Sequence, residues 1–215
     1  MRIVLWMLFA LINVGVFAQD DVPDYRSKKD NFAKIREKDI RSDLSVFTMA
    51  GIEESMSKQP LKNIPMTDYG RSFMTYEGNN IRVTIKTGIF NPSKHKLAFF
   101  EEKHLSKIDG KPFYGSYDKV PKTSIESVTV IVNNKDTVSI PAIAYIDLYN
   151  PSFTYKDASG TERSLNNVFL SSDGHKFYIY MLNQEASGTY EITWVIQDNK
   201  YLRRVLDFGL LKSGG

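Results

Sequence analysis

Acidic residues are the most abundant side chains in this sequence with catalytic potential. Two carboxylates at a suitable separation can hydrolyse a glycosidic bond, one as general acid and the other as nucleophile or base. The chain of 215 residues contains 25 Asp and Glu residues, so acids are available in every region and supply alone does not define a pair. Five are candidates for a hydrolase of this type: Glu101, Glu102, Asp118, Asp147 and Glu191.

Other residue types known for catalysis or metal binding form no recognisable motif. His95 and His104 lie nine residues apart and would point to opposite faces of one continuous strand, which is unsuitable for a shared metal. Ser72 lacks the second glycine of a nucleophile elbow, and no glycine-rich phosphate loop is present. Residues 157–162 resemble part of a calcium loop, but a hairpin turn explains them without metal. We therefore predict no catalytic residue, no metal site and no cofactor.

The segment 109–121 combines loop-forming residues with aromatic side chains. It holds two prolines and two glycines, which disfavour regular strands, together with Phe113, Tyr114 and Tyr117. Aromatic faces beside polar groups bind sugars or peptides, because a ring buries a large area at small entropic cost. We predict Phe113, Tyr114, Tyr117 and Asp118 as ligand-binding residues, with Tyr117 the most exposed ring. In the alternative interpretation, Phe113 and Tyr114 only fasten the loop to the domain.

The sequence on both sides of this loop predicts short strands that would hold it in place. Residues 81–85 alternate apolar and polar side chains, whereas residues 97–100 are apolar on both faces. Residues 125–132 and 137–140 are rich in Val and Ile and flank a good turn sequence at 133–136. Many short strands with no long helix predict a mainly β fold, an antiparallel β-sandwich or barrel-like domain.

The chain ends in the best-defined element, a hairpin. If Asp198 and Asn199 form a two-residue turn, Trp194 faces Arg203 across the two strands. Trp194 has apolar neighbours at two-residue spacing, so we expect it on the buried face. A contact of Arg203 with the indole ring depends on this register, which a change of one residue in the loop would alter.

The composition excludes some classes of partner. The 28 basic and 25 acidic residues give a net charge of +3, and the cations are interspersed with acids rather than clustered. Nucleic-acid binding needs clustered cations, so we exclude a nucleic-acid partner. The absence of cysteine removes disulfides, thiol catalysis and thiolate metal sites.

Residues 1–18 have the layout of a cleaved secretory signal peptide. Arg2 precedes an apolar run over 3–14, and small residues lead up to a cleavage site after Ala18. The mature chain would begin at Gln19 and work in the periplasm or outside the cell. No later apolar segment is long enough to span a bilayer. The lack of cysteine and of a glycosylation sequon favours a bacterial source.

A charged leader over residues 19–43 follows the signal. Twelve of the twenty residues from 24 to 43 are charged, which predicts a partly disordered or helical segment. Residues 44–215 form the expected β-rich domain. These observations predict an exported, non-catalytic β-sandwich protein that binds a glycan, an envelope component or another protein. A small secreted glycosidase-like hydrolase that uses paired carboxylates is the alternative.

Overall fold

The computed structural model describes residues 61–185 and 187–208, and this part of the chain is built almost entirely from antiparallel strands. Two 3-10 turns, η1 (Pro92–Lys94) and η2 (Ala142–Ala144), are its helical elements, and neither approaches the length needed to cross a bilayer. The predicted mainly β, antiparallel fold is confirmed. The strands are β1 (Lys62–Ile64), β2 (Met66–Tyr69), β3 (Phe73–Gly78), β4 (Ile81–Ile89), β5 (Leu97–Phe100), β6 (His104–Ile108), β7 (Thr123–Val132), β8 (Asp136–Val138), β9 (Tyr155–Lys156), β10 (Glu162–Arg163), β11 (Asn167–Leu170), β12 (Lys176–Asn183), β13 (Tyr190–Gln197) and β14 (Lys200–Phe208).

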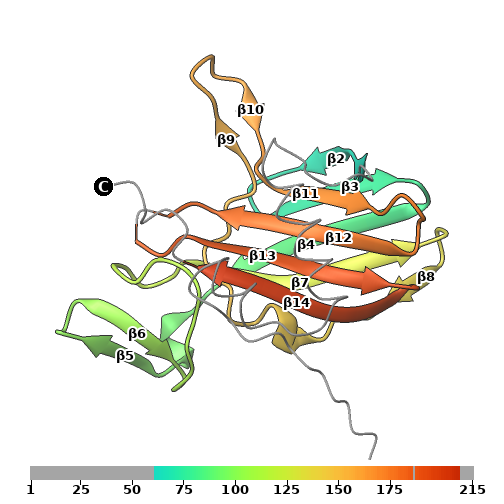
Figure 1. Cartoon of the computed structure of the whole chain (residues 1–215). Coiled ribbons are helices and arrows are strands. Elements are labelled where there is room, and N and C mark those ends of the chain that lie inside the picture. Colours follow the sequence, from blue (N-terminus) through green and yellow to red (C-terminus); the bar gives the residue numbers. More distant parts are fainter. Residues whose placement is uncertain (1–60, 186, 209–215) are drawn as a thin grey trace, which may run out of the picture.

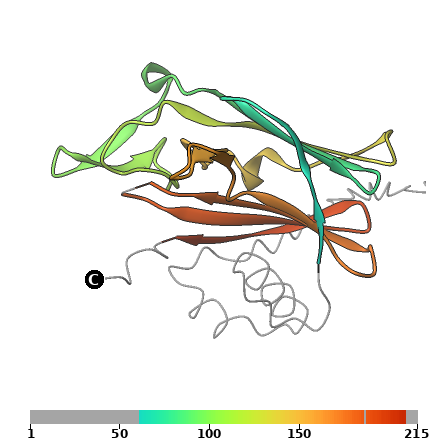
Figure 2. The same cartoon turned by 90° about the horizontal axis from the view of Figure 1, so that it is seen from above.

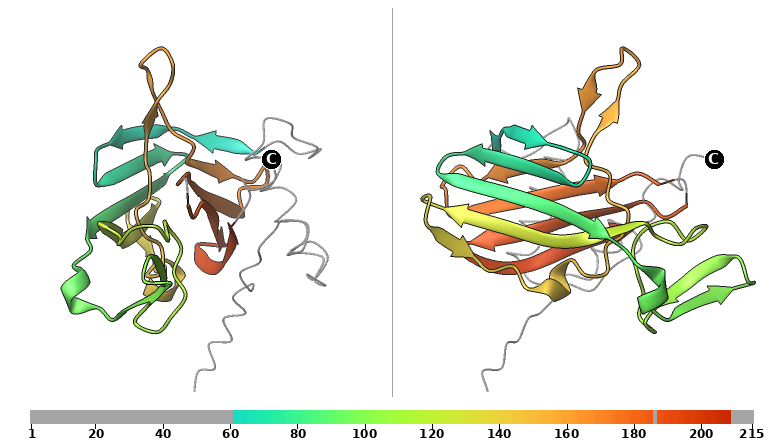
Figure 3. Two further views of the ribbon diagram at one scale, coloured as in Figure 1. Left: turned by 90° about the vertical axis from the view of Figure 1, so that its left-hand side faces the viewer. Right: turned by 180° about the vertical axis from the view of Figure 1, so that it is seen from behind.

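Two five-stranded sheets form the body of the protein and lie one above the other (Figures 1 and 2). Sheet A has the strand order β1-β11-β12-β13-β14, and sheet B has the order β2-β3-β4-β7-β8. The chain passes from sheet A to sheet B at Pro65, between β1 and β2. Two separate hairpins, β5–β6 and β9–β10, project from this sandwich (Figure 3).

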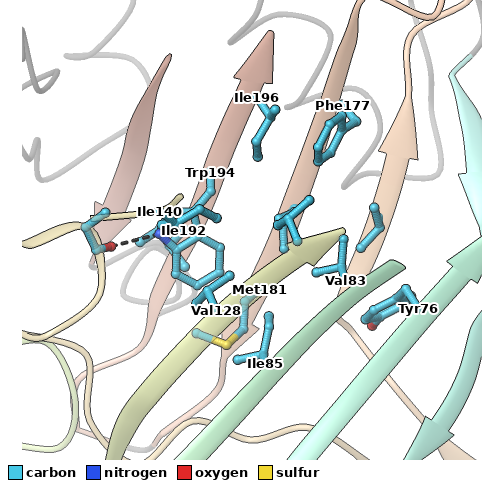
Figure 4. Close-up of a cluster of buried hydrophobic side chains, with 14 of the residues drawn as sticks. Tyr76, Val83, Ile85, Val128, Ile140, Phe177, Met181, Ile192, Trp194 and Ile196 are labelled. Atoms are coloured by element: carbon cyan, nitrogen blue, oxygen red, sulfur yellow. Dashed lines mark hydrogen bonds between the residues drawn. The ribbon is translucent and has the colours of Figure 1, made fainter. Parts of the chain in front are cut away.

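The hydrophobic core lies between the two sheets, because alternate residues of each strand point inward. Val83 and Ile85 from sheet B face Ile192 and Trp194 from sheet A in this cluster (Figure 4). Trp194 is completely buried, which confirms its expected place on the inner face of the C-terminal hairpin. Its indole Nε1 donates a hydrogen bond of 2.8 Å to the carbonyl oxygen of Ala144 in η2.

The C-terminal hairpin has the expected turn but a different register. Asp198 and Asn199 form a two-residue turn with φ angles of 49° and 60°. The pairing then shifts between Val195 and Ile196, which leaves Leu202 as an extra residue in β14. Trp194 consequently pairs with Arg204, and the expected contact with Arg203 is wrong. A β-bulge of this kind moves every later side chain of β14 to the other face.

The turn of the β9–β10 hairpin accounts for the segment that resembles a calcium loop. Asp157 Oδ1 accepts hydrogen bonds from the backbone amides of Ser159 and Thr161, both at 2.9 Å. Asp157 Oδ2 accepts a further bond from Arg163 at 3.0 Å. Hydrogen bonds from Ser159 and Arg163 lower the pKa of Asp157 below its usual range. Protein donors of the turn itself therefore surround this carboxylate.

The expected signal peptide (1–18) and charged leader (19–43) lie outside the described residues, as do residues 44–60 of the expected β-rich domain.

Candidate functional site

The segment 109–121, which we call the aromatic loop, is held to the residues that precede β13. The backbone amide of Tyr117 donates to the carbonyl oxygen of Ser187 at 2.9 Å, and the buried hydroxyls of Ser116 and Ser187 lie 2.8 Å apart. Gly188 has a φ of +130°, and a Cβ atom at this position would collide with the carbonyl of Gly115. The loop is therefore fixed against the end of sheet A by backbone contacts that leave no room for a side chain.

Two of the predicted binding residues fasten the loop to the domain. Tyr114 packs against the main core, with its ring 6.5 Å from that of Tyr190 in an edge arrangement. Phe113 packs against a second, smaller core, where its ring meets that of Tyr149 at 5.9 Å. Both side chains are half-buried. The fastening interpretation thus accounts for Phe113 and Tyr114.

Tyr117 and Asp118 meet a histidine from the β5–β6 hairpin. His104 Nδ1 lies 3.0 Å from Asp118 Oδ1, and its ring lies 5.8 Å from the half-buried ring of Tyr117. The carbonyl oxygen of Tyr117 accepts a hydrogen bond from the amide of Leu105 at 2.8 Å. The loop and the hairpin thus place a phenol, an imidazole and a carboxylate side by side at the surface.

An exposed phenylalanine extends this group of side chains. Phe100 pairs directly with His104 across the β5–β6 hairpin, and cross-strand partners share a face. The side chain of Phe100 is 62% exposed. We call the four side chains Phe100, His104, Tyr117 and Asp118 the aromatic shelf.

The base of the β5–β6 hairpin is rigidly attached. His95 Nδ1 lies 2.7 Å from Asp109 Oδ2, while Asp109 Oδ1 accepts from the backbone amide of Lys96 at 2.8 Å. These hydrogen bonds, first of all the one to His95, lower the pKa of Asp109 below its usual range. The ring of His95 stacks on that of Phe90 at 4.6 Å, which connects the hairpin to the second core.

An open hollow of about 320 Å³ is lined in part by Lys119, the residue that follows Asp118 of the aromatic shelf in the sequence. Lys119 Nζ pairs with Glu185 Oε2 at 2.9 Å, and Asn150 Oδ1 accepts from the backbone amides of Lys122 and Thr123. The hollow therefore offers two ammonium groups and one carboxylate to a ligand. Its lining residues are Lys119, Lys122, Thr123, Asn150, Pro151 and Glu185.

The other four candidate carboxylates lie in three separate places. Glu101 and Glu102 form the tip of the β5–β6 hairpin, with φ angles of 51° and 56°. Asp147 accepts two hydrogen bonds from the guanidinium of Arg204, at 2.7 and 2.9 Å, on the core side of sheet A. Glu191 lies on the opposite face of the same sheet. Asp147 and Glu191 are thus separated by sheet A, and Asp147 is engaged by Arg204, so these two do not form the open pair that a glycosidase requires.

Phe100 and His104 were not among the residues predicted from the sequence. A signal for Phe100 was present, because a two-stranded hairpin cannot bury residues 97–100 on both of its faces. His104 had no such signal, since its proximity to Asp118 depends on how the hairpin folds back on the loop. The described residues contain no cluster of three or more His, Asp or Glu side chains suited to a metal ion.

The fold defines a two-layer antiparallel β-sandwich with a surface aromatic site. No protein-family model, no curated protein and no solved structure matches this chain.

Proposed function

We propose that this chain is an exported, non-catalytic binding protein that holds a carbohydrate on the aromatic shelf. The observation that carries the proposal is the half-buried Tyr117 ring beside the Asp118–His104 pair. A sugar stacks its apolar C–H face on a ring and satisfies its hydroxyls with nearby carboxylate and imidazole groups. The exposed Phe100 adds a second ring for a further sugar unit.

Binding is better supported than hydrolysis. The candidate carboxylates lie in separate places or are engaged by Arg204 and His104, whereas the shelf and the hollow beside it are open to solvent. An envelope or extracellular glycan is the class of ligand that a protein with a secretory signal over 1–18 would meet. Envelope components and other proteins remain the alternative partners, to be distinguished by the test below.

We predict that Tyr117→Ala weakens carbohydrate binding by ~1–3 kcal/mol, the scale of a lost interface hot spot. The mature chain is screened on a glycan array that includes bacterial cell-wall fragments. The best-binding oligosaccharide is then titrated calorimetrically against the wild type and the variant. The melting temperature should change little, because the backbone contacts of Tyr117 remain.

Tyr155→Ala is the matched control, since Tyr155 is 44% exposed on the distant β9–β10 hairpin. It should leave carbohydrate affinity unchanged. A lower melting temperature with unchanged affinity in Tyr117→Ala would show that Tyr117 only fastens the loop. A wild type that binds no glycan on the array, but retains a protein from envelope extracts, would replace the carbohydrate by a protein partner.

A further inference from the structure

The face of sheet A that points away from the core is buried over its three strands β12, β13 and β14. Residues of β12, β13 and β14 that alternate with the core residues form this outer face, and seven of them are at most 5% exposed. Aromatic and branched apolar side chains predominate among them. The seven residues are Tyr178, Tyr180, Glu191, Thr193, Val195, Arg203 and Val205.

No described element lies over this face. Sheet B lies on the other side of sheet A (Figure 2). The outer face of sheet B behaves as expected for a two-layer sandwich, because Arg82, Lys86 and Thr129 are exposed there. The two outer faces of the same sandwich therefore differ in burial, and the outer face of sheet A is closed to solvent over β12, β13 and β14.

We propose that residues 44–60 of this chain cover the outer face of sheet A as a third layer. These residues lead directly into β1, which is the edge strand of this sheet. Four strand spacings of about 4.8 Å separate β1 from β14, so about 19 Å must be crossed. Seventeen residues reach about 25 Å even as a helix, and further when extended.

The composition of residues 44–60 fits this position. They contain three charged residues, whereas 24–43 contain twelve in a span of similar length. Val195 and Val205 on the outer face require apolar partners, because a polar layer would leave them no gain from burial. The segment supplies such partners in Leu44, Val46, Phe47, Met49, Ile52 and Met56.

The C-terminal residues 209–215 offer fewer apolar side chains to cover the outer face of sheet A. They number seven, and three of them are glycine. The charged leader over 19–43 could bury its few apolar residues only together with many charges, which is costly. A second copy of the chain is the remaining candidate to cover this face. Protection by a second copy would depend on protein concentration, so dilution in the labelling experiment below identifies it.

Cysteine accessibility tests the proposal, because the natural chain has no cysteine. Thr193→Cys reports on the outer face of sheet A, and Thr129→Cys reports on the exposed face of sheet B. In the mature chain we expect a maleimide to react ~100-fold more slowly at position 193 than at 129, because a covered site reacts only after local opening. A fast reaction at 193 would overturn the proposal.

Two triple substitutions then locate the covering segment. Changing Leu44, Phe47 and Ile52 together to Asp should raise the rate at 193 at least ~10-fold, because the layer must detach. The matched triple Phe32, Ile35 and Ile40 to Asp, in the charged leader, should leave it unchanged. If the leader triple has the larger effect, or if the protection of position 193 in the Thr193→Cys chain without further substitutions disappears on dilution, the segment 44–60 is not the cover.

A crosslinking experiment keeps the conclusion independent of any folding defect in the triple variant. Thr193→Cys is combined in turn with a cysteine at 44, 47, 52 or 56, and each double variant is oxidised at nanomolar concentration. At least one pair should form an intramolecular disulfide, while pairs with 32, 35 or 40 should not. Failure of all four pairs would overturn the proposal.

Discussion

Trp194 shows how one side chain connects three parts of the molecule. Its ring fills the space between the two sheets, and its Nε1 atom holds η2 through the carbonyl of Ala144 (Figure 4). Its cross-strand partner Arg204 binds Asp147, three residues after that carbonyl. The same stretch of chain is thus attached to β13 by a hydrogen bond and to β14 by an ion pair.

We predict that Trp194→Ala lowers the free energy of unfolding by ~3–5 kcal/mol, through lost apolar burial and the cavity that remains. Trp194→Phe should cost less, about 1–3 kcal/mol, mainly because the buried carbonyl of Ala144 loses its donor. Urea denaturation followed by far-UV circular dichroism measures both losses. Tryptophan fluorescence is unsuitable, because Trp194 is the only tryptophan after residue 18 and both variants remove it. A loss below 1 kcal/mol for the alanine variant would contradict the burial of this ring.

The aromatic shelf depends on two elements that follow one another along the chain. The β5–β6 hairpin contributes Phe100 and His104, while the following loop contributes Tyr117 and Asp118. The segment at 187–188 fixes the loop, and the His95–Asp109 pair fixes the hairpin. Their relative position, rather than any single residue, therefore creates the shelf.

We predict that Gly188→Ala damages both stability and the shelf, because the new Cβ displaces the carbonyl of Gly115 and with it the aromatic loop. Gly160→Ala is the matched control, since Gly160 also has a positive φ, +79°, but nothing lies within 4 Å of its would-be Cβ. The control should cost only the backbone strain of about 1 kcal/mol. Chemical unfolding and two-dimensional NMR of the shelf residues measure the two effects. Equal losses in the two variants would show that the Gly115–Gly188 approach is not tight.

On the scale of the whole molecule, two sheets with ordinary aliphatic packing hold the protein without disulfides. Sheet B presents charged residues to solvent, and the outer face of sheet A is closed. Folding of such a domain needs no oxidative machinery, because no thiol has to be paired.

The proposed export yields a simple prediction. The chain expressed in a bacterial host should be cleaved after Ala18, because Val16 and Ala18 occupy the positions that a signal peptidase reads. Intact-mass spectrometry of the exported protein should give the mass of a chain that begins at Gln19. A mature species that retains residues 1–18 would contradict the signal peptide and the proposed location.

The sequence by itself determined the fold class, most strand positions and the burial of Trp194. These features follow from period-two hydrophobic patterns and from turn residues, which are local properties of the chain. Asn133 and Asn134, for example, adopt the positive φ angles that their turn sequence predicts.

Only the tertiary structure decided the register of β14, the membership of the shelf and the closure of sheet A. The bulge at Leu202 adds one residue that no local pattern marks, and it moves Arg204 rather than Arg203 beside Trp194. Fourteen residues separate His104 from Asp118, and their contact exists because a hairpin folds back on a loop. Such contacts depend on how separate elements pack, and the hydrophobic pattern of each element alone does not contain that information.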